Sequence, residues 1–429
     1  MKALITRFRS FDRPSQVLMV NQFSINVGFY MLMPYLASYL AGPLGLAAWA
    51  VGLVLGVRNF SQQGMFLVGG TLADRLGYKP LIVAGCLLRT AGFVLLAAVD
   101  SLPAVLVAAA ATGFAGALFN PAVRAYLAAD AGPRRVEAFA VFNVFYQAGI
   151  LLGPLVGLAL TAVDFRITAL VAAAVFAALT LTQIRALPAQ TVEATTPAGP
   201  RPSILDDWRT VVTNRSFVLF AAAMIGSYVL SFQVYLALPL QAEVVAPDQV
   251  SATVLVTSLF AVSGLVAIAG QLRITSWCGN RWGPGRSLAV GMVVMATAFV
   301  PVAVFSSPTG TGWAMAAGAL VLSAVILSVG TAAVFPFEMD TVVALSGNRL
   351  VATHYGFYNT VVGVGILLGN LGTGAVFGWA ADAGLEWLIW VLLTAIGIGC
   401  AAALFLLHRT GRLTAPPPTP TDEQVSASA

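Results

Sequence analysis

The sequence has little charge for its length. Of its 429 residues, 9% are charged and 59% are hydrophobic. An average soluble domain carries about 25% charged residues, and no soluble fold could bury so much apolar side chain. The composition therefore excludes a soluble globular protein. The net charge of +5 belongs to loop residues, and we expect no nucleic-acid partner.

Cysteine and histidine are also scarce. Cys86, Cys278 and Cys400 fall in separate apolar stretches without the spacing of metal ligands, so we expect packing residues without disulfides. The two histidines lie far apart. A membrane-embedded enzyme or sensor would need a nucleophile with a base, or a metal cluster. The sequence offers neither, and it predicts no enzyme, no metal and no cofactor.

Long apolar runs, in contrast, are abundant. A run of about 20 apolar residues crosses the bilayer core as a helix, and a helix satisfies its own backbone in lipid. Runs bounded by charge or by Gly and Pro predict about twelve spans, at 16–40, 49–71, 80–99, 103–126, 136–161, 166–184, 216–240, 251–272, 287–306, 312–336, 353–379 and 386–407. The sequence therefore predicts an all-α, multi-pass membrane protein.

The basic residues fix an orientation. Most of the 22 Lys and Arg fall at the N-terminus and in every second loop, whereas the alternate loops contain only Arg166. Basic loops stay on the cytoplasmic side of a membrane. We therefore expect both termini in the cytoplasm. The apolar run that follows the basic N-terminus extends to Leu40, which is too long for a cleavable signal.

The chain divides into two halves that repeat. The segment Gly149–Gly153 recurs without change as Gly365–Gly369, which indicates duplication. Such repeats imply two pseudo-symmetric six-helix bundles with a substrate site between them and alternating access. We expect a short surface helix at Ile204–Val212 in the linker. The predicted domains are a basic N-terminus (1–15), an N-terminal bundle (16–184), a linker (185–215), a C-terminal bundle (216–407) and a disordered cytoplasmic tail (408–429).

A polar connection at 69–80 separates the second and third predicted spans. It reads Gly-Gly-Thr-Leu-Ala-Asp-Arg-Leu-Gly-Tyr-Lys-Pro, and Gly77 permits a turn that a residue with a Cβ resists. The connection resembles the Gly-x-Leu-Ala-Asp-Arg-x-Gly-Arg-Lys signature of major facilitator superfamily transporters. The flanks at 58–64 and 88–93 resemble the MdtH-like multidrug exporters of that superfamily.

This resemblance implies a conformational gate formed by Gly70, Asp74, Arg75, Gly77 and Lys79. In the family, the acid of the loop meets the cytoplasmic start of the eleventh helix, where a carboxylate suits the positive end of the helix dipole. Here the contact would fall near Ala352 to His354 and would hold the inner side closed. The second arginine of the family signature is Tyr78 in this chain, which puts in doubt a charge relay that depends on it.

The fifth predicted span contains Gly149, Gly153, Pro154 and Gly157. Small residues one turn apart let two helices touch closely, and Pro154 adds a bend. The pattern resembles the antiporter signature of drug:proton exporters in the superfamily. The alternative is a tight helix crossing without a role in antiport.

Polar and aromatic residues recur at helical spacing in spans one, two, five and seven, which line the cavity in the family. Ionisable groups inside spans are functional hypotheses by default; for Arg58 we favour a cavity role, and for Arg89 structural pairing or snorkelling. Each cavity residue could alternatively only bridge helices. The predicted substrate cavity comprises Gln22, Asn26, Tyr30, Arg58, Gln62, Asn143, Gln147, Tyr228, Phe232 and Tyr235.

A titrating group for proton coupling is harder to find. A buried carboxylate is the usual solution, but no Asp or Glu falls in the middle of a predicted span. Asn21 stands where MdtH-like exporters carry an Asp, and Ala109 where many drug:proton antiporters keep an Arg. The remaining candidates lie near predicted span ends: Glu243, Glu338, Asp340, Glu386 and His354.

The resemblance implies a multidrug efflux transporter of the bacterial cytoplasmic (inner) membrane, of the kind that confers antibiotic resistance. We expect it to export hydrophobic or amphiphilic small molecules by alternating access as a monomer in the lipid bilayer, coupled to proton influx. The alternative is a uniporter or importer of a small metabolite without proton coupling.

Overall fold

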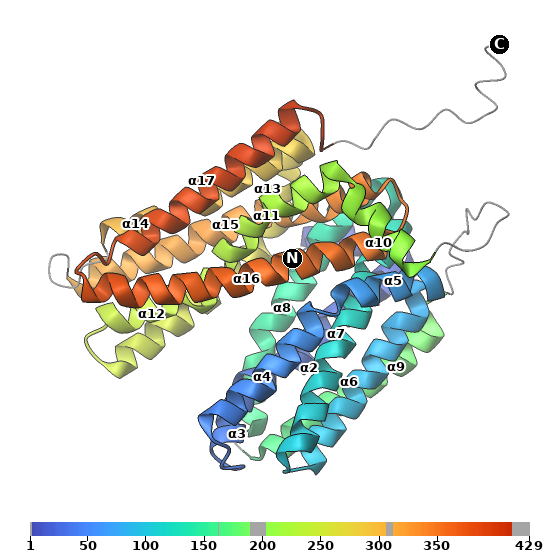
Figure 1. Cartoon of the computed structure of the whole chain (residues 1–429), viewed down its shortest axis with the longest axis horizontal. Helices are drawn as coiled ribbons and strands as arrows, with labels where there is room; N and C mark the ends of the chain where they lie inside the picture. Colours follow the sequence, from blue (N-terminus) through green and yellow to red (C-terminus); the bar gives the residue numbers. More distant parts are fainter. Residues whose placement is uncertain (1, 162, 189–202, 306–311, 414–429) are drawn as a thin grey trace.

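The computed structural model describes residues 2–161, 163–188, 203–305 and 312–413, and within these ranges the regular structure is entirely helical (Figure 1). The N-terminal half contains α1 (Lys2–Arg9), α2 (Arg13–Tyr30), α3 (Met33–Ala41), α4 (Ala48–Gln63), α5 (Phe66–Leu76), α6 (Tyr78–Ala98), α7 (Leu102–Ala131), η1 (Gly132–Arg134), α8 (Arg135–Thr161) and α9 (Phe165–Ala186). The Pro-rich part of the predicted linker (189–202) and most of the predicted disordered tail (414–429) lie outside the described residues.

The linker helix and the C-terminal half follow. They contain α10 (Ile204–Thr213), α11 (Arg215–Ser231), η2 (Phe232–Tyr235), α12 (Ala237–Val245), α13 (Gln249–Thr297), α14 (Val300–Val304), α15 (Trp313–Ser346), α16 (Val351–Asp382) and α17 (Leu388–Arg409). Polar side chains cap several of these helices, because the first N–H groups of a helix have no partner within it. Asn214 accepts from the backbone of Phe217, and Asp248 accepts from that of Ser251.

Eight segments of the described chain are long and apolar enough to cross a membrane, namely Tyr78–Ala98, Leu102–Thr161, Phe165–Ala186, Arg215–Val245, Gln249–Val304, Trp313–Ser346, Val351–Ala380 and Leu388–Arg409. Two of them, Leu102–Thr161 and Gln249–Val304, each contain two crossings. The pairs α2–α3 and α4–α5 supply the first two spans, each broken into shorter helices near its middle. The fold is the all-α, twelve-helix membrane architecture expected from the sequence.

Several predicted boundaries were wrong, and in each case a helix continues further than its apolar run. Helix α5 reaches Leu76, so Asp74 and Arg75 lie in its last turns and the break comes only at Gly77, whose φ is 97°. Helix α13 passes through the predicted loop to Gly283, whose φ is 70°. Helix α15 extends to Ser346. Polar residues near a helix end do not stop it, because a change of backbone conformation is what breaks the hydrogen-bond ladder.

The three glycines of the fifth predicted span pack α8 against α2. A Cβ at Gly149 would meet the side chain of Asn26, and one at Gly153 would meet Tyr30. At Gly157 a Cβ would collide with the backbone carbonyl of Met31. The close helix crossing predicted from the spacing is therefore confirmed.

The two halves meet at the end of the molecule that carries Arg75, Lys79 and Arg135, which we call the basic end. There α5 of one half touches α16 of the other, because Gly70 lies against the Ala352 carbonyl and Gly356 against the Phe66 carbonyl. In Figure 1 the halves converge around α5, α10 and the start of α16, whereas α3 and α12 lie apart. The halves also touch along α8 and α13, where Leu151 lies against Gly264.

Candidate functional site

Asp74 joins the two halves at the basic end. Its Oδ2 accepts hydrogen bonds from the Thr353 backbone N–H and hydroxyl, both at 2.7 Å. Its Oδ1 accepts from the backbone N–H of Ala352 at 3.1 Å and from the Tyr78 hydroxyl at 3.3 Å. The predicted contact with the start of α16 is confirmed.

The start of α16 needs such a partner. The first N–H groups of a helix have no acceptor within it, and they carry partial positive charge. No acidic residue lies in the first turn of α16 itself. The carboxylate of α5 therefore caps a helix that belongs to the other half. Tyr78, which stands where the family signature has its second arginine, hydrogen-bonds to the same carboxylate.

Other polar contacts cross between the halves. Arg135 on α8 pairs with Asp340 on α15, with Nε 2.7 Å from Oδ1. Arg124 on α7 donates to the side-chain oxygen of Asn359 on α16 at 2.9 Å. Together with the Asp74 contact, these links connect three helix pairs that lie far apart in the sequence. Separating the halves at the basic end would break all of them.

The Arg135–Asp340 pair can be tested by a double-mutant cycle. We expect Arg135→Ala and Asp340→Ala each to favour opening of the basic end, and the double variant to cost less than the sum of both. For a partly exposed pair the coupling should be about 0.5–1 kcal/mol. The measurement is the separation of spin labels across the basic end; additive effects would show that the pair stores no coupling.

The linker helix α10 is bound to α5. Arg75 Nη2 lies 2.6 Å from Asp207 Oδ2, and Trp208 Nε1 donates to the Thr71 hydroxyl at 2.8 Å. Ser203 and Asp206 form a capping box at the start of α10, and the hydrogen bonds from Ser203 lower the pKa of the Asp206 carboxyl. The surface helix predicted in the linker is therefore present, and it holds Arg75.

Lys79 also has a partner within the N-terminal half. Its Nζ donates to the carbonyl of Ile184, near the end of α9, at 2.8 Å. Gly70 and Gly77 contribute through the backbone, the first by close contact with α16 and the second by its turn. Of the five predicted gate residues, Gly70 and Asp74 thus touch the opposite half directly, while Arg75 and Lys79 hold neighbouring helices.

Three tyrosines and one arginine from both halves form a second cluster, which we call the central cluster. Tyr30 on α2 is within electrostatic reach of Tyr146, Tyr235 and Arg58. These residues come from α2, α4, α8 and η2, so the cluster draws on both halves. Tyr235 is 49% exposed. The structure thus brings together three predicted cavity residues and adds Tyr146, which the spacing did not select.

Arg58 makes weak contacts for a cation in an apolar surrounding. Its guanidinium lies 4.9 Å from the centre of the Phe29 ring. One terminal nitrogen is 3.3 Å from Gln62 Oε1, and Nε has no hydrogen-bond partner among the described residues. No described carboxylate forms an ion pair with it. Its positive charge is therefore available to other groups near the centre.

Arg89 is held differently. It is 3% exposed and lies against the rings of three phenylalanines, with its guanidinium 4.8–5.4 Å from their centres. A terminal nitrogen donates to the Thr112 carbonyl at 2.9 Å. Cation–π contacts of this kind replace the ion pair or the snorkelled position that we considered for it. The three rings belong to Phe29, Phe119 and Phe176.

Two of three buried cavity amides bridge helices in this conformation, and the third, Gln22, bonds within α2. Gln22 donates to Asn26, which in turn donates to the Tyr146 carbonyl on α8 at 2.8 Å. Asn143 donates to Gln271 Oε1 on α13 at 2.7 Å. All three amides are buried, and the contacts of Asn26 and Asn143 correspond to the helix-bridging alternative.

The remaining predicted cavity residues are Phe232, Gln62, Gln147 and Tyr228. Phe232 packs its ring 5.6 Å from that of Tyr235. Gln62 faces Arg58, and Gln147 is half-buried on α8. Tyr228 contacts Glu338, a carboxylate that we expected near the end of a span. Its hydroxyl donates to Glu338 Oε1 at 2.8 Å.

Glu338, which we expected near the end of a span, lies inside helix α15. It is 3% exposed, and α15 continues beyond it for two turns to Ser346. The predicted span ended at Pro336, since proline commonly ends or kinks a helix. Here Pro336 lies inside the helix, which membrane helices tolerate when neighbours satisfy the freed backbone groups. The sequence did contain a signal for the longer helix. After Pro336 no glycine or proline follows until Gly347, which caps α15.

Residues 18–370 match the family model of the Major Facilitator Superfamily. The chain is also 62% identical over 417 residues to the uncharacterized MFS-type transporter Rv0849 of Mycobacterium tuberculosis, covering 95% of this chain and 98% of the relative. The chain belongs to the major facilitator superfamily.

More distant relatives in the superfamily also align over most of the chain. It is 26% identical over 404 residues to the multidrug resistance protein MdtH of Yersinia pestis, covering 94% of this chain and 96% of MdtH. The crystal structure of an auto-inhibited POT family peptide transporter superposes with a TM-score of 0.63 at 17% identity, covering 96% of this chain and all of that one. The latter similarity shows the fold alone.

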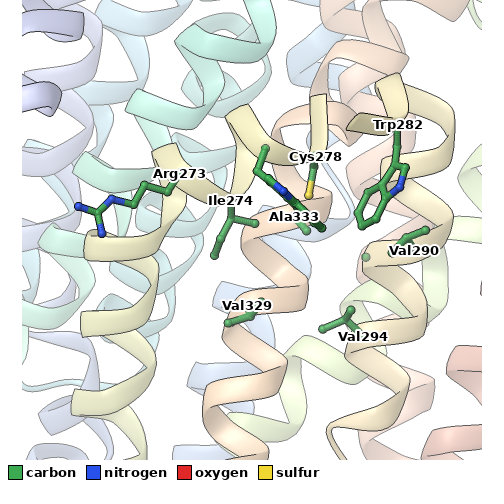
Figure 2. Close-up of a pocket in the computed structure, with 10 residues that line it drawn as sticks. Arg273, Ile274, Cys278, Trp282, Val290, Val294, Val329 and Ala333 are labelled. Carbon is green, nitrogen blue, oxygen red and sulfur yellow. The ribbon is translucent and has the colours of Figure 1, made fainter. Parts of the chain in front are cut away.

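Two pockets of this superfamily member lie away from its central cluster. Figure 2 shows the first, of about 390 Å³. It lies between α15 and the two parts of α13 that meet at the Gly283 kink, with Trp282 and Val290 on α13 and Val329 on α15. The second, of about 700 Å³, lies in the N-terminal half near Asp100 and Arg166. Neither is lined by a residue of the predicted substrate cavity.

Proposed function

We propose that this protein exports hydrophobic or amphiphilic small molecules by alternating access, coupled to proton influx. The single observation that carries the proposal is the capping of α16 by Asp74, because it joins the two repeated halves through contacts that can open and close. If the halves move against each other, such a contact forms in one conformation and breaks in the other. The similarity to MdtH supports multidrug substrates.

The basic end is assigned to the cytoplasm in this proposal. Arg75, Lys79 and Arg135 lie there, and such residues are retained on the cytoplasmic side of membranes. The conformation joined at that end is then closed toward the cytoplasm of a bacterial inner membrane. Opening to the cytoplasm would break the Asp74 and Arg135 contacts, and contacts at the other end would replace them.

The central cluster is the proposed substrate site. Tyr30 and Tyr235 offer rings for apolar substrates, and Arg58 offers a charge without an ion-pair partner among the described residues. Aromatic and flexible surfaces of this type accept ligands of varied shape. The cluster is formed between the halves of one chain, so a monomer is sufficient.

Transport in proteoliposomes tests the proposal. Purified protein is reconstituted, a pH gradient is imposed, and the flux of ethidium, a lipophilic cation, is compared with that of neutral lipophilic dyes. We expect concentrative flux that stops when an ionophore collapses the gradient. Empty liposomes and Arg58→Ala protein are the controls. Flux that equilibrates a metabolite regardless of the gradient would instead favour the uniporter alternative.

A further inference from the structure

Glu338 is a buried carboxyl group with an unusual set of partners. Its Oε1 accepts hydrogen bonds from Tyr228 on α11 at 2.8 Å and from Tyr358 on α16 at 2.6 Å. Both donors reach the same oxygen, which leaves Oε2 as the oxygen that can carry a proton. The site therefore suits both the ionised and the protonated carboxyl.

No cation neutralises this carboxylate at close range. Among the described residues, Glu338 forms no ion pair. The positive charge that acts on it is that of Arg124 on α7, in the other half, which donates to Asn359. A charge buried without a close partner is costly, and such a group in a membrane protein takes up a proton or pairs when it moves.

The titratable and charged groups around Glu338 come from five helices. Those that act on it or share its contacts are Tyr228 on α11, Tyr355 and Tyr358 on α16, Arg124 on α7, and Asp340 on α15 with its partner Arg135 on α8. Asp340 is already paired with Arg135 at 2.7 Å. Glu338 is thus the carboxyl in this cluster that has no ion-pair partner.

A chain of phenols connects Glu338 with the central cluster. Tyr228 is within electrostatic reach of Tyr146, and Tyr146 is within reach of Tyr30 and Tyr235. Tyr235 is half-exposed, whereas Glu338 is buried. Hydroxyl groups both donate and accept hydrogen bonds, so such a series, with water between its members, can pass a proton.

We propose that Glu338 is the proton-binding site that couples transport to the proton gradient, with the phenols as its access route; this rests on the proposed function. The Glu338 carboxylate takes up one proton from the side facing away from the basic end and later releases it at the basic end. While ionised, it attracts Arg124 of the opposite half and favours the joined state. Protonation removes that attraction and lets the halves separate.

The decisive variant is Glu338→Gln. The amide oxygen can still accept from both phenols, so the packing is kept while the titrating group is removed. In proteoliposomes we expect loss of ethidium accumulation driven by a pH gradient, with retained exchange of ethidium down its own gradient. Glu243→Gln makes the same chemical change at an exposed carboxyl and should remain coupled.

A second variant covers the case in which Glu338→Gln does not fold. Tyr358→Phe removes one donor that stabilises the ionised carboxyl. The pH midpoint of transport should therefore move upward by about one unit, the equivalent of one hydrogen bond. A purely structural role for Tyr358 would change the rate without moving the midpoint, and that result would overturn the assignment.

The outcomes also separate this assignment from the proposed function. If the wild-type protein ignores the pH gradient, proton coupling itself is refuted. If the wild-type protein is coupled and Glu338→Gln remains coupled, only the assignment of Glu338 is refuted. Loss of coupling with retained exchange in Glu338→Gln, against a coupled Glu243→Gln control, supports both.

Discussion

Replacing Gly70 with alanine should shift the protein strongly away from the conformation joined at the basic end. A Cβ at this position would collide with the backbone carbonyl of Ala352, which cannot move without moving α16. Overpacking costs about 1–3 kcal/mol, which changes a conformational ratio by about 5–150-fold. Spin labels at Leu76 and Arg349, one in each half and both exposed, should report the longer separation.

The neighbouring glycine provides the control. A Cβ at Gly69 would collide with the carbonyl of Ala117, which belongs to the same half. Gly69→Ala should therefore lower the melting temperature without changing the balance between conformations. Gly56→Ala should alter neither, because nothing lies within 4 Å of the added atom. Label distances in Gly70→Ala that match the wild type would contradict the role of the α5–α16 contact.

Asp74→Asn should open the same contact by another route. The carboxylate accepts four hydrogen bonds, two on each oxygen. An asparagine has only one acceptor oxygen. Its NH₂ group would face the two N–H or O–H donors that now bond to the other carboxylate oxygen. Leaving buried donors unsatisfied costs about 1–3 kcal/mol, so the ratio should again shift by about 5–150-fold, and ethidium transport should fall accordingly.

Asp100→Asn is the matched control for this change. Asp100 is an exposed carboxylate that pairs with Arg166 within the N-terminal half, so its neutralisation should leave the label distances at the basic end unaltered. Unchanged transport and unchanged distances in Asp74→Asn would remove the gate role of Asp74. A change in both variants would instead indicate a general effect of charge.

The gate contact was the part of the site most open to prediction. The position of Asp74 within a recognisable signature implied its partner on α16, although the two segments are 278 residues apart. The partners of the adjacent bases were not predicted, because Asp207 and the Ile184 carbonyl belong to segments without a comparable signature. A sequence signature therefore predicted the contact of Asp74, which the family shares, but not the contacts of Arg75 and Lys79.

The central residues were predicted less well. Helical spacing selected Gln22, Asn26 and Asn143 as polar positions, but spacing does not tell an amide that faces a cavity from one that bridges two helices. Glu338 was placed near a span end because Pro336 looked like a helix terminus. Whether a proline ends a helix depends on what its neighbours supply to the backbone, and those neighbours lie on other helices.

The sequence by itself determined the membrane class, the approximate positions of the spans and the duplicated halves, because hydrophobicity, charge and repetition are properties read along a single chain. Only the tertiary structure decided which polar groups meet: Asp74 with the start of α16, Arg135 with Asp340, and Glu338 with two tyrosines. These side-chain contacts depend on the rotation and tilt of each helix against its neighbours. Packing of all the helices together sets those angles.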